Sequence, residues 1–106
     1  MRIALPGAAV GALLFAHAAV AAERTVTMSG LRYAPAAVEA KVGDVLRFVN
    51  DDRVDHDVFV PTRGFGVDLG VQKPGTQSEL TLGKPGTFEV ECVFHPHMLA
   101  TVRVGR

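Results

Sequence analysis

The sequence has a single cysteine and no tryptophan. One cysteine excludes a disulfide within the chain, although small exported domains commonly depend on such a link. In an oxidising compartment an unpaired thiol is a hazard, an intermolecular link or a metal ligand. A bound metal would protect the thiol of Cys92 and would also stabilise a small fold.

The chain also lacks an excess of either charge. Eleven Lys and Arg residues balance eleven Asp and Glu residues, and no block of one sign stands out. A basic surface that attracts nucleic acid is therefore excluded, as is a strongly charged face that would steer a partner. We expect no nucleic-acid partner.

One long stretch without charge lies near the N-terminus. Arg2 precedes an apolar run over residues 3–19, and Val20-Ala21-Ala22 supplies the small residues after which a signal peptidase cuts. The pattern predicts a signal peptide over residues 1–22, export to the periplasm, and a mature domain over residues 23–106. Cleavage removes one basic residue and no acidic one, so the formal net charge of the mature domain becomes −1.

An uncleaved membrane anchor is the alternative, because the stretch from Ile3 to Ala22 is about as long as a spanning helix requires. Pro6 and His17 interrupt it, however, and it is rich in Ala and Gly. We therefore expect no stable membrane association after cleavage. His17 lies in the leader and is set aside as a metal ligand.

The mature region shows no sustained 3.6-residue period of apolar residues, which argues against long helices. Short alternating runs of Val, Thr, Phe and Leu are separated by turn residues such as Lys73-Pro74-Gly75 and Lys84-Pro85-Gly86. Their length and spacing predict an all-β sandwich or barrel. The predicted strands cover residues 24–29, 36–41, 44–50, 56–61, 66–71, 77–82, 87–93 and 99–104.

Four potential metal donors lie in the segment Cys92-Val93-Phe94-His95-Pro96-His97-Met98. Thiolate and thioether are soft ligands that suit Cu(I), and imidazole suits both common oxidation states of copper. Two His, one Cys and a distant Met form the ligand set of a blue copper electron-transfer site. One histidine must then come from elsewhere, and His56 is available.

Strand alternation places these residues on inward faces. Cys92 shares a face with Phe88 and Val90, and His56 shares a face with Val58 and Val60, while Asp57 and Phe59 point the other way. Taken singly, an inward Cys, a His at a strand end and a Met near a strand are usually ordinary packing. Their combination in an exported β-domain indicates a metal site.

The chain resembles the cupredoxins over essentially the whole mature region. The resemblance rests on the short Cys92–Met98 loop, on Tyr33-Ala34-Pro35, on Val42-Gly43-Asp44-Val45 leading to Phe48-Val49-Asn50, and on Pro85-Gly86-Thr87-Phe88 leading into Cys92. It implies a Greek-key β-sandwich of about seven or eight strands and one copper ion. By this resemblance His56, Cys92 and His95 are the equatorial ligands, and Met98 is the weak axial ligand, as in amicyanin-type members.

Three positions depart from the family pattern. Asp57 stands where many members carry Asn, and Phe94 stands where many carry Pro. His97 offers a second imidazole two residues after His95 and is an alternative ligand. His95 keeps the family spacing and is the predicted one.

The resemblance implies a one-electron carrier, active as a monomer and not an enzyme, that meets redox protein partners by transient contact. We expect the contact surface to lie around His95, with Pro96, His97 and either Phe65 or Pro61 in it; ordinary loop packing is the other interpretation of the last two. A copper carrier or storage protein is the alternative function, and an enzyme with an open metal position is a third.

Overall fold

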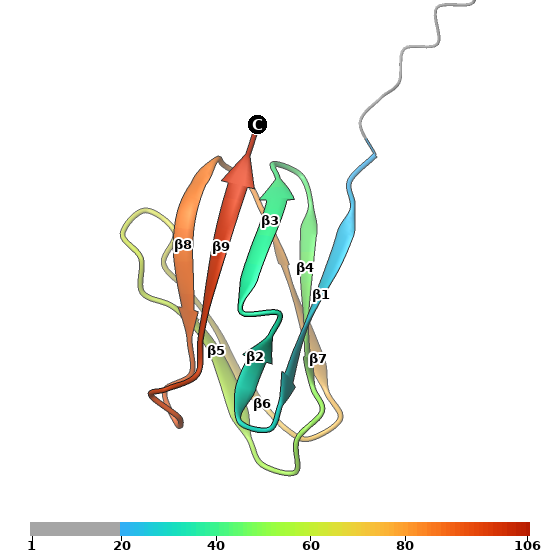
Figure 1. The fold of residues 1–106 in the computed structure, drawn as a ribbon, viewed down its shortest axis with the longest axis vertical. Helices are drawn as coiled ribbons and strands as arrows, with labels where there is room; N and C mark the ends of the chain where they lie inside the picture. Colours follow the sequence, from blue (N-terminus) through green and yellow to red (C-terminus); the bar gives the residue numbers. More distant parts are fainter. Residues whose placement is uncertain (1–19) are drawn as a thin grey trace, which may run out of the picture.

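The computed structural model describes residues 20–106, so most of the predicted signal peptide, with His17, lies outside the described residues. Figure 1 shows a sandwich of two β-sheets. Nine strands form it: β1 Glu23–Ser29, β2 Arg32–Ala34, β3 Ala37–Lys41, β4 Val45–Asn50, β5 His56–Val60, β6 Val67–Gln72, β7 Gln77–Thr81, β8 Gly86–Glu91 and β9 Leu99–Gly105.

The predicted all-β class is confirmed. One sheet has the strand order β2-β1-β4-β7 and the other the order β3-β9-β8-β5-β6. Two pairs, β1 with β4 and β3 with β9, are parallel, and the remaining pairs are antiparallel. Within residues 20–106, no helix is long and apolar enough to cross a membrane.

The structure has one strand more than the eight predicted. The additional strand, β2, is only three residues long, which is too short for an alternating pattern to identify it. It pairs antiparallel with β1, with Ser29 opposite Arg32, so Gly30 and Leu31 form a two-residue hairpin turn. β2 brings Tyr33 into the core, where its side chain is 3% exposed.

The hairpin turn between β1 and β2 has an unusual backbone. Gly30 has φ 62° and Leu31 has φ 58°, so both residues are left-handed. Two consecutive positive φ angles are what the tightest hairpin turns require, and Asn-Gly is the usual choice. A left-handed Leu costs roughly 1–2 kcal/mol, so other contacts must hold this turn.

The core lies between the two sheets and follows the strand alternation. In β4 the inward residues Leu46, Phe48 and Asn50 are fully buried and the residues between them are half-exposed. Burial of apolar side chains of this size contributes about 1.5–3 kcal/mol each. The remaining buried apolar residues are Val26, Met28, Tyr33, Val38, Ala40, Val58, Val60, Leu82, Phe88, Val90, Cys92, Met98, Ala100, Val102 and Val104.

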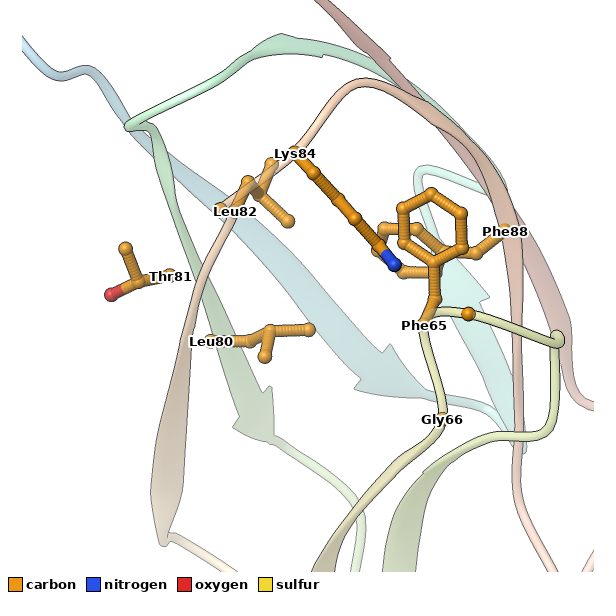
Figure 2. Close-up of a pocket in the computed structure, with 9 residues that line it drawn as sticks. Phe65, Gly66, Leu80, Thr81, Leu82, Lys84 and Phe88 are labelled. Atoms are coloured by element: carbon orange, nitrogen blue, oxygen red, sulfur yellow. The ribbon is translucent and has the colours of Figure 1, made fainter.

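Phe65 belongs to the end of the sandwich where β8 begins. Its ring stacks on Phe88 at 5.3 Å between centroids, and the Lys84 ammonium lies 4.6 Å from its centroid (Figure 2). Phe65 also approaches the backbone of Gly86, the first residue of β8. Cys92 follows the other end of that strand.

The expectation that Phe65 or Pro61 lines the contact surface around His95 is therefore wrong. Phe65 packs at the far end of β8, and Pro61 follows the last residue of β5 whereas His56 is the first. A five-residue strand separates the two ends by about 16 Å. Ordinary loop packing explains Phe65, whereas Pro61 is an exposed residue at the end opposite the donors.

Candidate metal centre

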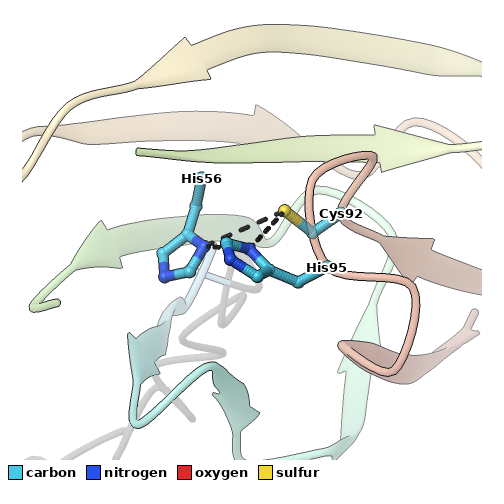
Figure 3. A group of neighbouring side chains, drawn as sticks. All are labelled: His56, Cys92 and His95. Atoms are coloured by element: carbon cyan, nitrogen blue, oxygen red, sulfur yellow. Dashed lines mark hydrogen bonds between the residues drawn. The ribbon is translucent and has the colours of Figure 1, made fainter. Parts of the chain in front are cut away.

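Three donor side chains that are far apart in the sequence meet at one end of the sandwich (Figure 3). His56 begins β5, Cys92 follows β8, and His95 lies in the loop between β8 and β9. The Nδ1 atoms of His56 and His95 are 3.2 Å apart. The Cys92 Sγ atom is 3.9 Å from the first Nδ1 and 3.7 Å from the second.

The inward faces predicted from alternation are confirmed. Cys92 is 2% exposed and lies on the buried face of β8 with Phe88 and Val90, and His56 is completely buried on the face of Val58 and Val60. Since β5 and β8 are neighbours in one sheet, side chains on the same face at the same end come together.

These three atoms fit a metal ion. A point equidistant from all three lies about 2 Å from each, in the usual range of metal–nitrogen and metal–sulfur bonds. A thiolate with two imidazoles is a soft-to-intermediate donor set, which suits copper better than magnesium or calcium. Within residues 20–106 this is the one group of three His, Cys, Asp or Glu side chains found close enough to share an ion.

The loop that carries His95 is short and internally bonded. The His95 N–H donates to the Cys92 carbonyl at 3.2 Å, and the Met98 N–H donates to the His95 carbonyl at 2.9 Å. Two successive turns therefore bring the chain from β8 to β9. Met98 is 1% exposed and immediately precedes β9, so its thioether is held in the core beside this loop.

His97 lies outside the three-donor group. Its side chain is exposed, and its ring centroid is 6.3 Å from that of His95 in an edge-on arrangement. His97 instead lines a surface pocket with Arg32, Tyr33 and Leu99. The geometry therefore favours the predicted His95 over His97.

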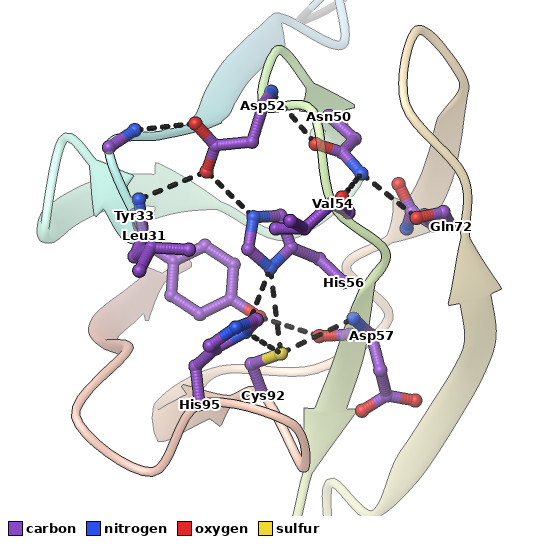
Figure 4. Close-up of polar contacts among 11 residues, drawn as sticks. Leu31, Tyr33, Asn50, Asp52, Val54, His56, Asp57, Gln72, Cys92 and His95 are labelled. Carbon is purple, nitrogen blue, oxygen red and sulfur yellow. Dashed lines mark hydrogen bonds and ion pairs between the residues drawn. The ribbon is translucent and has the colours of Figure 1, made fainter.

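The structure adds Asp52, which the sequence did not single out. Its Oδ2 atom lies 2.7 Å from Nε2 of His56, on the opposite side of the ring from Cys92 and His95 (Figure 4). Although burial acts to raise it, hydrogen bonds from His56 and from the N–H groups of Leu31 and Gly30 lower the pKa of Asp52 below its usual value. The available signal in the sequence was a carboxylate four residues before the predicted ligand His56. Asp51 and Asp55 also lie close to His56 in the sequence, so this signal did not distinguish Asp52 from them.

Asp57 is buried although alternation placed it on the face opposite His56. Its side chain is 3% exposed, and Oδ1 has no hydrogen-bond partner within residues 20–106. Burial, and then the neighbouring Asp68 carboxyl, raise the pKa of Asp57 to about 6. Its backbone N–H donates a hydrogen bond to Cys92 Sγ at 3.4 Å. This main-chain hydrogen bond connects β5 to the residue that follows β8.

Tyr33, on the short strand β2, forms hydrogen bonds at the same end of the sandwich. Its hydroxyl lies 2.9 Å from the Asp57 carbonyl and 2.8 Å from the Glu91 carbonyl, next to two of the donor residues. Burial, with the nearby Cys92, Asp57 and Glu91, raises the pKa of Tyr33 far above its usual value. The hydroxyl therefore stays protonated and remains a hydrogen-bond donor.

Two curated relatives are both named methylamine utilization protein MauL. The chain is 32% identical to the Methylophilus methylotrophus protein over 82 residues and spans about half of its length, with 74% of this chain and 47% of the relative covered. It is 29% identical to the Methylorubrum extorquens protein over 97 residues, which cover 91% of this chain and 85% of the relative. No family model matches the chain.

Solved structures with similar folds include copper proteins. A reduced amicyanin mutant matches with a TM-score of 0.74 and 25% identity, covering 84% of this chain and 87% of the amicyanin. The copper-containing nitrite reductase of Thermus scotoductus matches with a TM-score of 0.74 and 28% identity, but only 22% of that chain is covered. The chain therefore has the fold of the cupredoxins, is similar to amicyanin, and brings its His, Cys and His donors together as a copper site.

Proposed function

We propose that this protein carries single electrons between redox partners, with one copper ion held by His56, Cys92 and His95 and with Met98 as a weak axial ligand. The convergence of three donor atoms within 4.8 Å of one another, two of them on buried side chains, is the observation that carries the proposal. When bound, copper supplies a one-electron Cu(I)/Cu(II) couple.

The protein's part is to hold the donors in place. Cys92 and His56 lie on the ends of paired strands, and Tyr33 and the Asp57 N–H brace these ends. Donors on rigid strands change position little when the charge of the site changes, which favours fast electron transfer. Complete burial of His56 also excludes water from one side of the site.

His95 provides the proposed contact for partners. It is the most exposed of the three donors, and the neighbouring Val93, Phe94 and Leu99 are 58%, 49% and 48% exposed. Apolar side chains around a half-buried ligand suit the small and transient interfaces of redox proteins. We propose that the protein meets its partners there as a monomer.

We also propose that the N-terminal segment is a signal peptide and that the mature domain works in the periplasm. The supporting evidence is the sequence pattern of residues 1–22. The names of both MauL relatives support methylamine metabolism as the setting of the electron transfer. A single domain with a four-donor site supports electron transfer rather than catalysis.

The test is the visible spectrum of the copper-loaded protein. We expect an intense blue copper–thiolate band that disappears on reduction and that Cys92→Ser abolishes. A weak spectrum with tight copper binding would instead favour a copper carrier or storage protein. Rapid, reversible reduction by a redox protein would separate electron transfer from mere binding.

The histidine assignment has its own matched pair of variants. We expect His95→Ala to remove the blue band and His97→Ala to retain it, because the His95 ring nitrogen lies in the donor group and the His97 ring is exposed. The reverse pattern would move the ligand two residues along the loop.

A further inference from the structure

We propose that Asp52 is the residue that positions His56 for the metal, and that the hairpin turn Gly30-Leu31 is the anchor that fixes Asp52. The inference rests on the proposed ligand role of His56. It assigns a function to a carboxylate and to a turn that lie outside the donor set.

The first observation is that the two nitrogens of the His56 ring face different partners. Nε2 lies 2.7 Å from Asp52 Oδ2, whereas Nδ1 faces His95 Nδ1 and Cys92 Sγ. A neutral imidazole carries one proton, and a carboxylate can only accept it. Asp52 therefore holds the proton on Nε2 and leaves the Nδ1 lone pair free on the side where the donors meet.

The second observation is that Asp52 is itself held firmly. Its Oδ1 atom accepts the Gly30 N–H at 2.7 Å, and Oδ2 accepts the Leu31 N–H at 3.0 Å in addition to the His56 ring. Its own N–H donates to Asn50 Oδ1 at 3.0 Å. Figure 4 shows this carboxylate between the turn and the ring.

The third observation is the backbone of the turn. Leu31 is left-handed, a conformation that a branched side chain rarely adopts and that persists only where surrounding contacts impose it. The left-handed pair turns two successive N–H groups toward one carboxylate. The strained turn and the carboxylate thus support each other, and the result is a fixed hydrogen-bond acceptor behind His56.

The decisive variant is Asp52→Asn, which preserves shape and removes the charge. An amide has one acceptor oxygen, so it cannot accept the His56 ring proton and both turn N–H groups as the carboxylate does. Asp51→Asn is the matched control: it removes the same charge from an exposed neighbouring residue whose backbone N–H bonds to Met28.

Two measurements test the proposal. In the metal-free wild-type protein, nitrogen-15 NMR should show His56 protonated at Nε2 and not at Nδ1, with slow exchange of that proton. Titration with Zn²⁺ should then show that Asp52→Asn weakens binding by about 10–100-fold and exposes the Nε2 proton to exchange. Asp51→Asn should resemble wild type in both measurements.

A His56 protonated at Nδ1 in the metal-free wild-type protein would overturn the proposal without any variant. Asp52→Asn with wild-type exchange and wild-type Zn²⁺ affinity would overturn it as well. If the wild-type protein bound neither Zn²⁺ nor copper yet kept a protected Nε2 proton that Asp52→Asn lost, the ligand role would fail and the positioning role would stand.

Discussion

At the scale of single residues, Asp57 has an unusual environment. It is a carboxyl group buried beside the donor set with one oxygen lacking a hydrogen-bond partner. A buried, partly unsatisfied carboxylate is costly in the charged form. The raised pKa of about 6 is the direct consequence.

The pKa of Asp57 gives a signed prediction for stability. Because it is higher in the folded protein than in the unfolded chain, the folded protein binds more protons between about pH 4 and pH 6. The contribution of Asp57 is therefore most favourable below about pH 4 and is lost as the pH rises through about 6. We expect Asp57→Asn to raise the free energy of unfolding at pH 7 by about 1–2 kcal/mol.

Urea unfolding of the metal-free wild-type protein and of Asp57→Asn, at about pH 4.5 and at about pH 7, checks this difference. The increase in the free energy of unfolding caused by Asp57→Asn should be smaller at the lower pH, because Asp57 is already protonated there. Asp55→Asn, a change at an exposed carboxyl two residues away, is the control. An equal gain at both pH values would show that Asp57 does not titrate with a raised pKa.

At the scale of elements, β8 is constrained at both ends. Its C-terminal end leads into the donor loop, and its first residue, Gly86, has φ 140° and lies under the Phe65 ring. A Cβ atom on Gly86 would lie 2.5 Å from Phe65 Cζ. Phe65 is stacked on Phe88, so it has little freedom to move away.

We therefore expect Gly86→Ala to destabilise the fold by about 1–3 kcal/mol through overpacking and backbone strain. The blue band of the copper-loaded variant should be unchanged, because the substitution lies at the opposite end of β8 from Cys92. Urea unfolding and the visible spectrum check the two expectations separately.

Gly83 provides the control for this substitution. No atom lies within 4 Å of a Cβ built at Gly83, and its φ is outside the left-handed region. Gly83→Ala should change the free energy of unfolding by less than about 1 kcal/mol. Equal effects at both glycines would remove Phe65 packing as the cause.

At the scale of the whole molecule, the site should couple to folding. Its donors come from β5, from the end of β8 and from the following loop, so they converge only in the folded chain. A ligand bound by the folded state alone stabilises it by about 4 kcal/mol at a free concentration a thousandfold above its dissociation constant. We expect copper to raise the melting temperature markedly.

Calorimetry with and without saturating Cu(I) under anaerobic conditions measures this effect. Cys92→Ser should lose most of the gain, while His97→Ala should keep it. Identical melting curves for the wild-type protein with and without the metal would contradict the proposed site.

The N-terminal boundary of the folded domain gives a second prediction at this scale. The Ala22 N–H donates to Asp44 Oδ1 at 2.9 Å, and the Val45 N–H donates to the Ala22 carbonyl at 3.0 Å. Cleavage after Ala22 would remove both hydrogen bonds, whereas cleavage after Ala21, with Ala19 and Ala21 as the small residues, would keep them.

We therefore expect a chain that begins with Ala22 to be more stable than the predicted mature chain that begins with Glu23, by about 1–2 kcal/mol in the free energy of unfolding. Urea unfolding of the two metal-free chains, prepared with these two N-termini, checks this difference. Equal free energies of unfolding for the two chains would show that the two hydrogen bonds are dispensable.

The sequence alone predicted the class of fold and the donor residues, because both depend on local pattern. Period-two alternation gave the inward faces of Cys92 and His56, and the crowding of Cys92, His95 and Met98 into one loop is visible without a fold. Because Cys92 and His95 are close in the sequence, their approach depends only on the local turn between them.

Only the tertiary structure decided what lies around the donors. The approach of Asp52 to His56 depends on a ring angle, and the support of Asp52 by Gly30 and Leu31 depends on a hairpin turn some twenty residues away. The burial of Asp57 depends on the neighbouring strand rather than on its own alternation. Local patterns determine which face a residue takes, but contacts between segments distant in sequence exist only once the sheets have packed.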